Sequence, residues 1–99
     1  MATITSTLTT GALATAAALT GYATVAGARA DLLPFGCERE AMRAAAVKAH
    51  SLAQALERGE HFTPEQFEVA ARRIDDEMAW AGERRFPACT GKWLALFTG

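Results

Sequence analysis

The sequence predicts a small, mainly α-helical protein built on an antiparallel helical hairpin, with an N-terminal segment rich in alanine and threonine packed against it. Apolar side chains recur every three or four residues over about 38–58 and again over about 64–82. A short stretch rich in turn-forming residues separates the two runs, which favours an antiparallel pair. The chain has 99 residues, so we expect one domain spanning 1–99.

The first element is an uncharged segment, residues 1–28, whereas all 10 lysines and arginines and all 11 acidic residues lie in residues 29–99. Over residues 3–9, threonine at every second position alternates with Ile4, Ser6 and Leu8, which is a strand-like period, and residues 12–18 favour helix. We expect a soluble element that packs on the hairpin or on neighbouring copies.

Two alternatives for this segment stay open. Residues 2–28 are long enough for a single membrane span, although eight threonines dilute its hydropathy. A signal peptide is the other alternative, since Ala28-Arg29-Ala30 resembles a cleavage site before Asp31, although no basic residue precedes the apolar stretch.

A connector is expected over residues 30–37. Pro34 disfavours helix at the preceding residue, and Gly36 permits a turn. Leu32, Leu33 and Phe35 form a short apolar cluster that we expect to fold back onto the core.

The first helix of the hairpin is predicted over about 38–58 and the second over about 64–82. The apolar stripe of the first helix is followed at once by Gly59, which suits a helix C-terminus. The second begins with Thr63 as N-cap, Pro64 at the first helical position and Gln66 as partner in a capping box. The outer face of the second helix is charged, since it carries Glu68, Arg72, Asp75 and Asp76. We interpret this whole face as a solvated surface.

The C-terminal tail carries a short apolar run, residues 92–97, in which Trp93 and Phe97 stand four apart. We expect it to dock on the hairpin; the alternative is an exposed patch for a partner. Cys37 and Cys89 flank the hairpin at the same end, so a disulfide is geometrically conceivable, but we favour two free thiols.

The sequence argues against several function classes. A net charge of −1 provides no global field for nucleic acid. The histidines and cysteines have no spacing typical of a metal site, and no nucleophile stands near a base and an orienting group. We therefore expect no catalysis, no cofactor, no metal and no specific nucleic-acid binding.

The remaining interpretation is a non-catalytic protein–protein interaction module, such as a small inhibitor or adaptor of the kind that a phage or another mobile element encodes. Its partner would be another protein or a second copy, and its location the cytoplasm, with membrane or secreted locations as alternatives. A structural or accessory subunit of an assembly, with or without a single-pass membrane anchor through residues 2–28, is the alternative function. Aromatic and arginine side chains dominate interface energetics, so the predicted contact residues are Trp80, Arg84, Arg85, Trp93 and Phe97.

Overall fold

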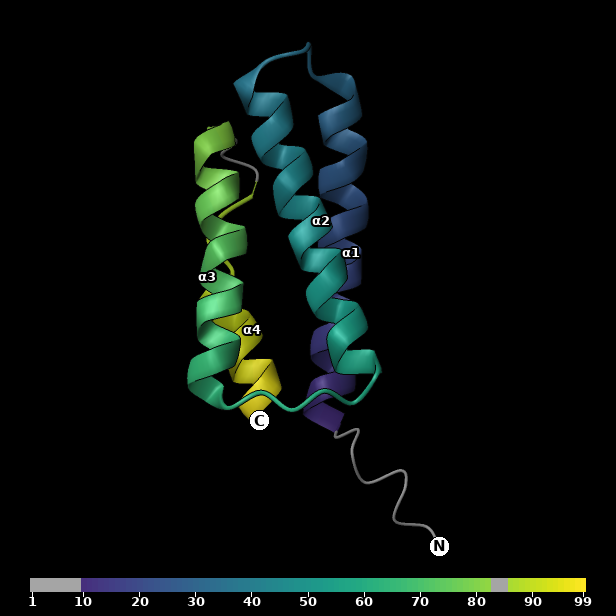
Figure 1. The fold of residues 1–99 in the computed structure, drawn as a ribbon, viewed down its shortest axis with the longest axis vertical. Helices are drawn as coiled ribbons and strands as arrows, with labels where there is room; N and C mark the ends of the chain where they lie inside the picture. The colour runs from purple at the N-terminus through teal and green to yellow at the C-terminus, as the bar shows by residue number, and fades with distance from the viewer. Residues whose placement is uncertain (1–9, 83–85) are drawn as a thin grey trace, which may run out of the picture.

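The computed structural model describes residues 10–82 and 86–99, which form four α-helices and, within those ranges, no β-strand (Figure 1). The helices are α1 (Thr10–Leu32), α2 (Cys37–Glu57), α3 (Pro64–Ala81) and α4 (Thr90–Thr98). The predicted hairpin is therefore confirmed as α2 and α3, with bounds within one residue of those expected. The strand-like run at residues 3–9 lies outside the described residues.

The helices pack as an antiparallel bundle in which each contacts its two neighbours: α1 with α2, α2 with α3, α3 with α4, and α4 with α1. In Figure 1 the three long helices run the length of the bundle, and the short α4 lies beside the lower part of α3. The core contains Leu52 of α2 and Ile74 of α3 in one cluster. The apolar stripes of the hairpin thus face a common interior, and α1 and α4 supply the additional cover that two helices cannot provide.

Helices α1 and α2 approach each other through small side chains. The buried residues of α1 follow a helical period and are mostly alanine, namely Ala12, Thr15, Ala16, Leu19, Ala26 and Ala30. On α2, Ala45, Ala49 and Ala53 recur every four residues and are all buried. Rows of alanine on both helices permit close packing, so the described part of the uncharged segment, residues 10–28, is a core element of the bundle.

The ends of α2 and α3 follow the local signals in the sequence. After α2, Gly59 adopts φ 81°, and the amides of Gly59 and Glu60 donate to the carbonyls of Leu56 and Ala55. This pair of bonds is a Schellman motif. At the start of α3, the Gln66 amide donates to the Thr63 hydroxyl at 3.1 Å, and the Thr63 amide donates to the Gln66 side chain at 2.9 Å. The capping box is therefore confirmed.

The connector between α1 and α2 differs from the expectation. Helix α1 continues through Leu32 and α2 already begins at Cys37, so the connector is residues 33–36 rather than 30–37. Burial of Ala30 against the core holds this last turn of α1 in place. The expected return of the apolar cluster to the core is also wrong for two of its three members. Leu33 packs partly on the core, but Leu32 and Phe35 are exposed.

The C-terminal tail docks on the hairpin, as its apolar run predicted. Residues 90–98 form α4, which places Trp93 in the core and stacks the Phe97 ring on that of Phe67 with 4.5 Å between centroids. Gly91 lies inside the first turn of α4.

Helix α4 passes unusually close to the start of α1. A Cβ atom added to Gly11 would lie 2.7 Å from the carbonyl oxygen of Leu96 and 2.8 Å from that of Phe97. Both neighbours are backbone atoms, which cannot rotate away as a flexible side chain can. By contrast, nothing lies within 4 Å of a Cβ atom added to Gly21, on the same helix.

We predict opposite effects for alanine at these two glycines. Gly11→Ala lowers the free energy of unfolding by about 1–3 kcal/mol, because it overpacks the α1–α4 contact. Gly21→Ala raises it by roughly 0.5–1 kcal/mol, because alanine favours helix where the side chain meets open space. Urea denaturation followed by circular dichroism measures both, and equal shifts of the two midpoints would contradict the observed packing of α4.

Candidate functional site

The predicted contact residues fall into three environments. The side chain of Trp80 is 80% exposed on α3, whereas Trp93 is 2% exposed inside the core. Phe97 is partly buried in its stack with Phe67. Arg84 and Arg85 lie outside the described residues. Of the five, Trp80 is the described side chain that is most exposed while the bundle is folded.

Trp93 belongs to an aromatic cluster that holds α4 against α1. The Tyr22 ring of α1 meets the rings of Phe86 and Trp93 edge-on, with centroid distances of 5.4 and 5.0 Å. Edge-on pairs of this kind add about 0.5–1.5 kcal/mol each beyond simple burial. The indole of Trp93 therefore has a structural role in the folded protein, and its spacing to Phe97 reflects docking rather than an exposed aromatic pair.

The carboxylate of Asp75 caps α4 from the neighbouring helix. It accepts hydrogen bonds from the amide of Cys89 at 3.0 Å, the amide of Thr90 at 2.9 Å and the hydroxyl of Thr90. The first amides of a helix have no partner within it, so a carboxylate there satisfies them and favours the helix dipole. The interpretation of Asp75 as a solvated residue is wrong for this reason. Its partners lie 14 and 15 residues away, and no local spacing signals them.

The Tyr22 hydroxyl lies near this capping carboxylate, is buried, and has no hydrogen-bond partner in the described structure. Burial, followed by the nearby Asp75 and Cys89, raises the pKa of Tyr22 well above its usual range. The phenol therefore stays neutral at any ordinary pH. The bonds of Asp75 to the start of α4 and the rings packed around Tyr22 stabilise the fold.

One end of the bundle exposes large apolar side chains. Leu32 ends α1, Phe35 lies in the connector, and Trp80 lies near the end of α3. They are 77%, 88% and 80% exposed, respectively. The guanidinium of Arg39 lies 4.5 Å from the centre of the Phe35 ring, which holds this ring at the surface. We name Leu32, Phe35 and Trp80 the apolar end. The sequence pattern predicted that Leu32 and Phe35 pack on the core, so neither residue was among the predicted contact residues.

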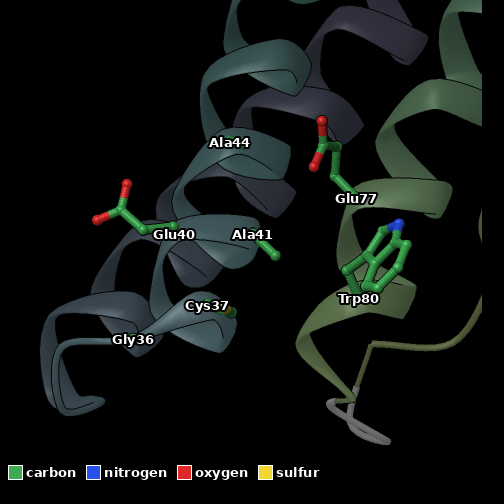
Figure 2. Close-up of a pocket in the computed structure, with 7 residues that line it drawn as sticks. All are labelled: Gly36, Cys37, Glu40, Ala41, Ala44, Glu77 and Trp80. Atoms are coloured by element: carbon green, nitrogen blue, oxygen red, sulfur yellow. The ribbon is translucent and has the colours of Figure 1, made fainter.

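A shallow groove of about 690 Å³ adjoins Trp80 between α2 and α3. Figure 2 shows Ala41 pointing from α2 toward α3, with Trp80 opposite it on α3. Cys37, the first residue of α2, also lines the groove. Ala41 and Ala44 are small, so α2 leaves room beside the indole. The groove therefore offers an apolar floor next to an exposed aromatic ring, an arrangement typical of sites that receive an apolar side chain.

Acidic residues lie beside the groove and the indole, although Figure 2 shows the Glu40 carboxylate pointing away from Trp80. Glu40 and Glu77 line the groove, and Asp76 shares a second hollow with Trp80 on its other side. Glu77 accepts a hydrogen bond from Lys48 at 2.8 Å, whereas Glu40 and Asp76 are exposed. Among the described residues that line these two hollows there is no lysine or arginine.

Both cysteines are free thiols in the structure, Cys37 exposed and Cys89 partly buried. Burial, reinforced by Asp75, raises the pKa of the Cys89 thiol, which makes it less reactive. Within residues 10–82 and 86–99, no three histidine, cysteine or acidic side chains converge as a metal ion would require.

The outer face of α1 is uncharged over most of its length and exposes Leu13 and Val25. By length and composition α1 is apolar enough to cross a membrane. The core helix of a bundle and an N-terminal signal sequence share these properties.

Comparisons with protein-family models, with curated proteins and with solved structures found no match to this chain.

We predict that Asp75→Ala loosens α4. The substitution leaves the amides of Cys89 and Thr90 without an acceptor, so the free energy of unfolding falls by about 2 kcal/mol. Asp76→Ala is the matched control, because the Asp76 side chain is exposed and has no described bond to α4. We expect this substitution to change the free energy of unfolding by less than about 0.5 kcal/mol. Thermal unfolding of both variants measures this, and an equal loss in each would show that Asp75 does not cap α4.

Proposed function

We propose that this protein is a non-catalytic protein-binding module that docks on another protein through the apolar end of its bundle. The observation that carries the proposal is Trp80, a large aromatic side chain left 80% exposed although the core is otherwise well covered. Exposed aromatic anchors next to a hollow are the residues that contribute most to binding free energy in protein interfaces. Leu32 and Phe35 at the same end extend the apolar surface, as an interface centre requires.

The rest of the chain supports this proposal by its form. Among the described residues no three histidine, cysteine or acidic side chains converge as a metal ion would require, and the other tryptophan is used inside the core. A rigid helical bundle presents an exposed side chain with little loss of conformational entropy on binding. Docking as an inhibitor or adaptor would need nothing more than such a surface.

A subunit of an assembly is the second candidate, and the uncharged outer face of α1 favours it. In that case α1 would contact a second copy or a lipid bilayer instead of water. Fractionation of cells without detergent tests the membrane form of this candidate, because a membrane subunit sediments with the membranes and a free docking module stays in the supernatant.

We predict that Trp80→Ala weakens partner binding at least tenfold while the fold stays intact, since the side chain contacts little of its own protein. Val69→Ala, another exposed apolar residue on α3 away from the groove, leaves the affinity unchanged. Isothermal titration with the partner recovered by affinity purification measures both, and circular dichroism controls the fold.

If Trp80→Ala binds as well as the parent protein, docking through the apolar end is wrong. Trp93→Ala distinguishes the two tryptophans further, because removing this core indole costs about 3–5 kcal/mol of stability and therefore affects folding before binding.

A further inference from the structure

We infer that α4 is a detachable strap, which leaves the bundle and unfolds as one unit while α1, α2 and α3 stay packed together. Its release uncovers an apolar slot between α1 and α3. This inference is independent of the proposed docking through the apolar end. It follows from the helices that α4 touches, from the way its start is held, and from the side chains that it covers.

Helix α4 packs its backbone against α1 and α3, the two helices that flank α2. Among the described residues, Cα atoms of α4 lie within 8 Å of Cα atoms of α1 and α3, whereas none lies that close to α2. Helices α1 and α3 do not approach each other within this distance either. Release of α4 therefore leaves the α1–α2 and α2–α3 interfaces in place, whereas loss of α1 or α3 would break an interface with α2.

The start of α4 is held by α3 and not by its own sequence. The side chain of Cys89, at the N-cap position, makes no capping hydrogen bond. Asp75 of α3 accepts the bonds of the first amides instead. Helix α3, by contrast, is capped by its own Thr63 and Gln66. A helix of 9 residues without a cap is not stable in water, so α4 unfolds when it leaves Asp75.

Helix α4 covers one aromatic ring on each of the helices it contacts. Trp93 meets the Tyr22 ring of α1 edge-on, and Phe97 stacks on the Phe67 ring of α3. In the closed bundle, Trp93 is 2% and Phe67 0% exposed. Because α1 and α3 do not approach each other, release of α4 opens Tyr22 and Phe67 to solvent on the walls of one slot. The open form thus carries a second apolar surface, separate from the apolar end.

Native-state hydrogen exchange on the folded full-length protein, followed over a series of low urea concentrations, tests this inference. We expect the amides of Leu94 and Phe97 in α4 to exchange through one shared opening. This opening should be at least about tenfold more populated than the global unfolding that exposes the amide of Leu52 in α2. It should also depend less steeply on urea, because it exposes less surface than global unfolding does.

Asp75→Ala tests whether α4 opens as one unit. The substitution removes the cap at the start of α4, so we expect it to increase the shared opening roughly thirtyfold at both Leu94 and Phe97. Asp76→Ala is the matched control, because the Asp76 side chain is exposed and has no described bond to α4. This variant should leave the exchange of both amides unchanged.

Two results would overturn the detachable strap. Leu94 may not share the opening population and urea slope of Leu52, because α4 would then leave only when the whole chain unfolds; this comparison needs no variant. Exchange at Phe97 that does not respond to Asp75→Ala would also overturn it, since the end of α4 would then fray by itself. Neither result bears on docking through Trp80, which Trp80→Ala tests separately.

Discussion

The close approach of α1 and α2 is the constraint on which the rest of this structure depends. Two rows of small side chains, exemplified by Ala26 on α1 and Ala45 on α2, let the helix backbones come near each other and bury both rows. Without α1, one side of the hairpin would expose an alanine and leucine stripe to water. The free energy of burying apolar area, about 25 cal/mol per Å², makes that exposure costly for so small a domain.

The fourth position of the bundle is filled by a helix that could not exist alone. Helix α4 has 9 residues, too few for a stable helix in water. It is held by the buried Trp93, the stack of Phe97 on Phe67, and the capping carboxylate of Asp75. Because the tail aromatics are used in this way, the Trp93 indole is covered by its own protein in the folded bundle. Trp80, near the C-terminal end of α3, is exposed instead. For this reason the proposed docking surface lies at that end of the bundle.

Local patterns predicted the hairpin well because each signal lay within a few residues of the feature it controls. The capping box at Thr63 and Gln66 and the glycine after α2 are examples. The buried face of α1 could not be found in this way, since buried Ala16 and exposed Ala17 are the same residue type. The role of Asp75 depended on a tail that joins α3 only after folding, and the exposure of Phe35 depended on a connector whose path no spacing specifies. Of the site, the sequence predicted Trp80, but not the groove beside it, which forms only when Ala41 of α2 meets α3.

Native-state hydrogen exchange on the purified full-length chain tests most directly whether the uncharged helix is part of the core. The account predicts that the amides of Leu19 in α1 and Leu52 in α2 exchange with the same free energy of opening, equal to that of global unfolding. Exchange at Leu19 through a much smaller opening free energy, with Leu52 still protected, would contradict it, because α1 would then detach while the hairpin stayed folded.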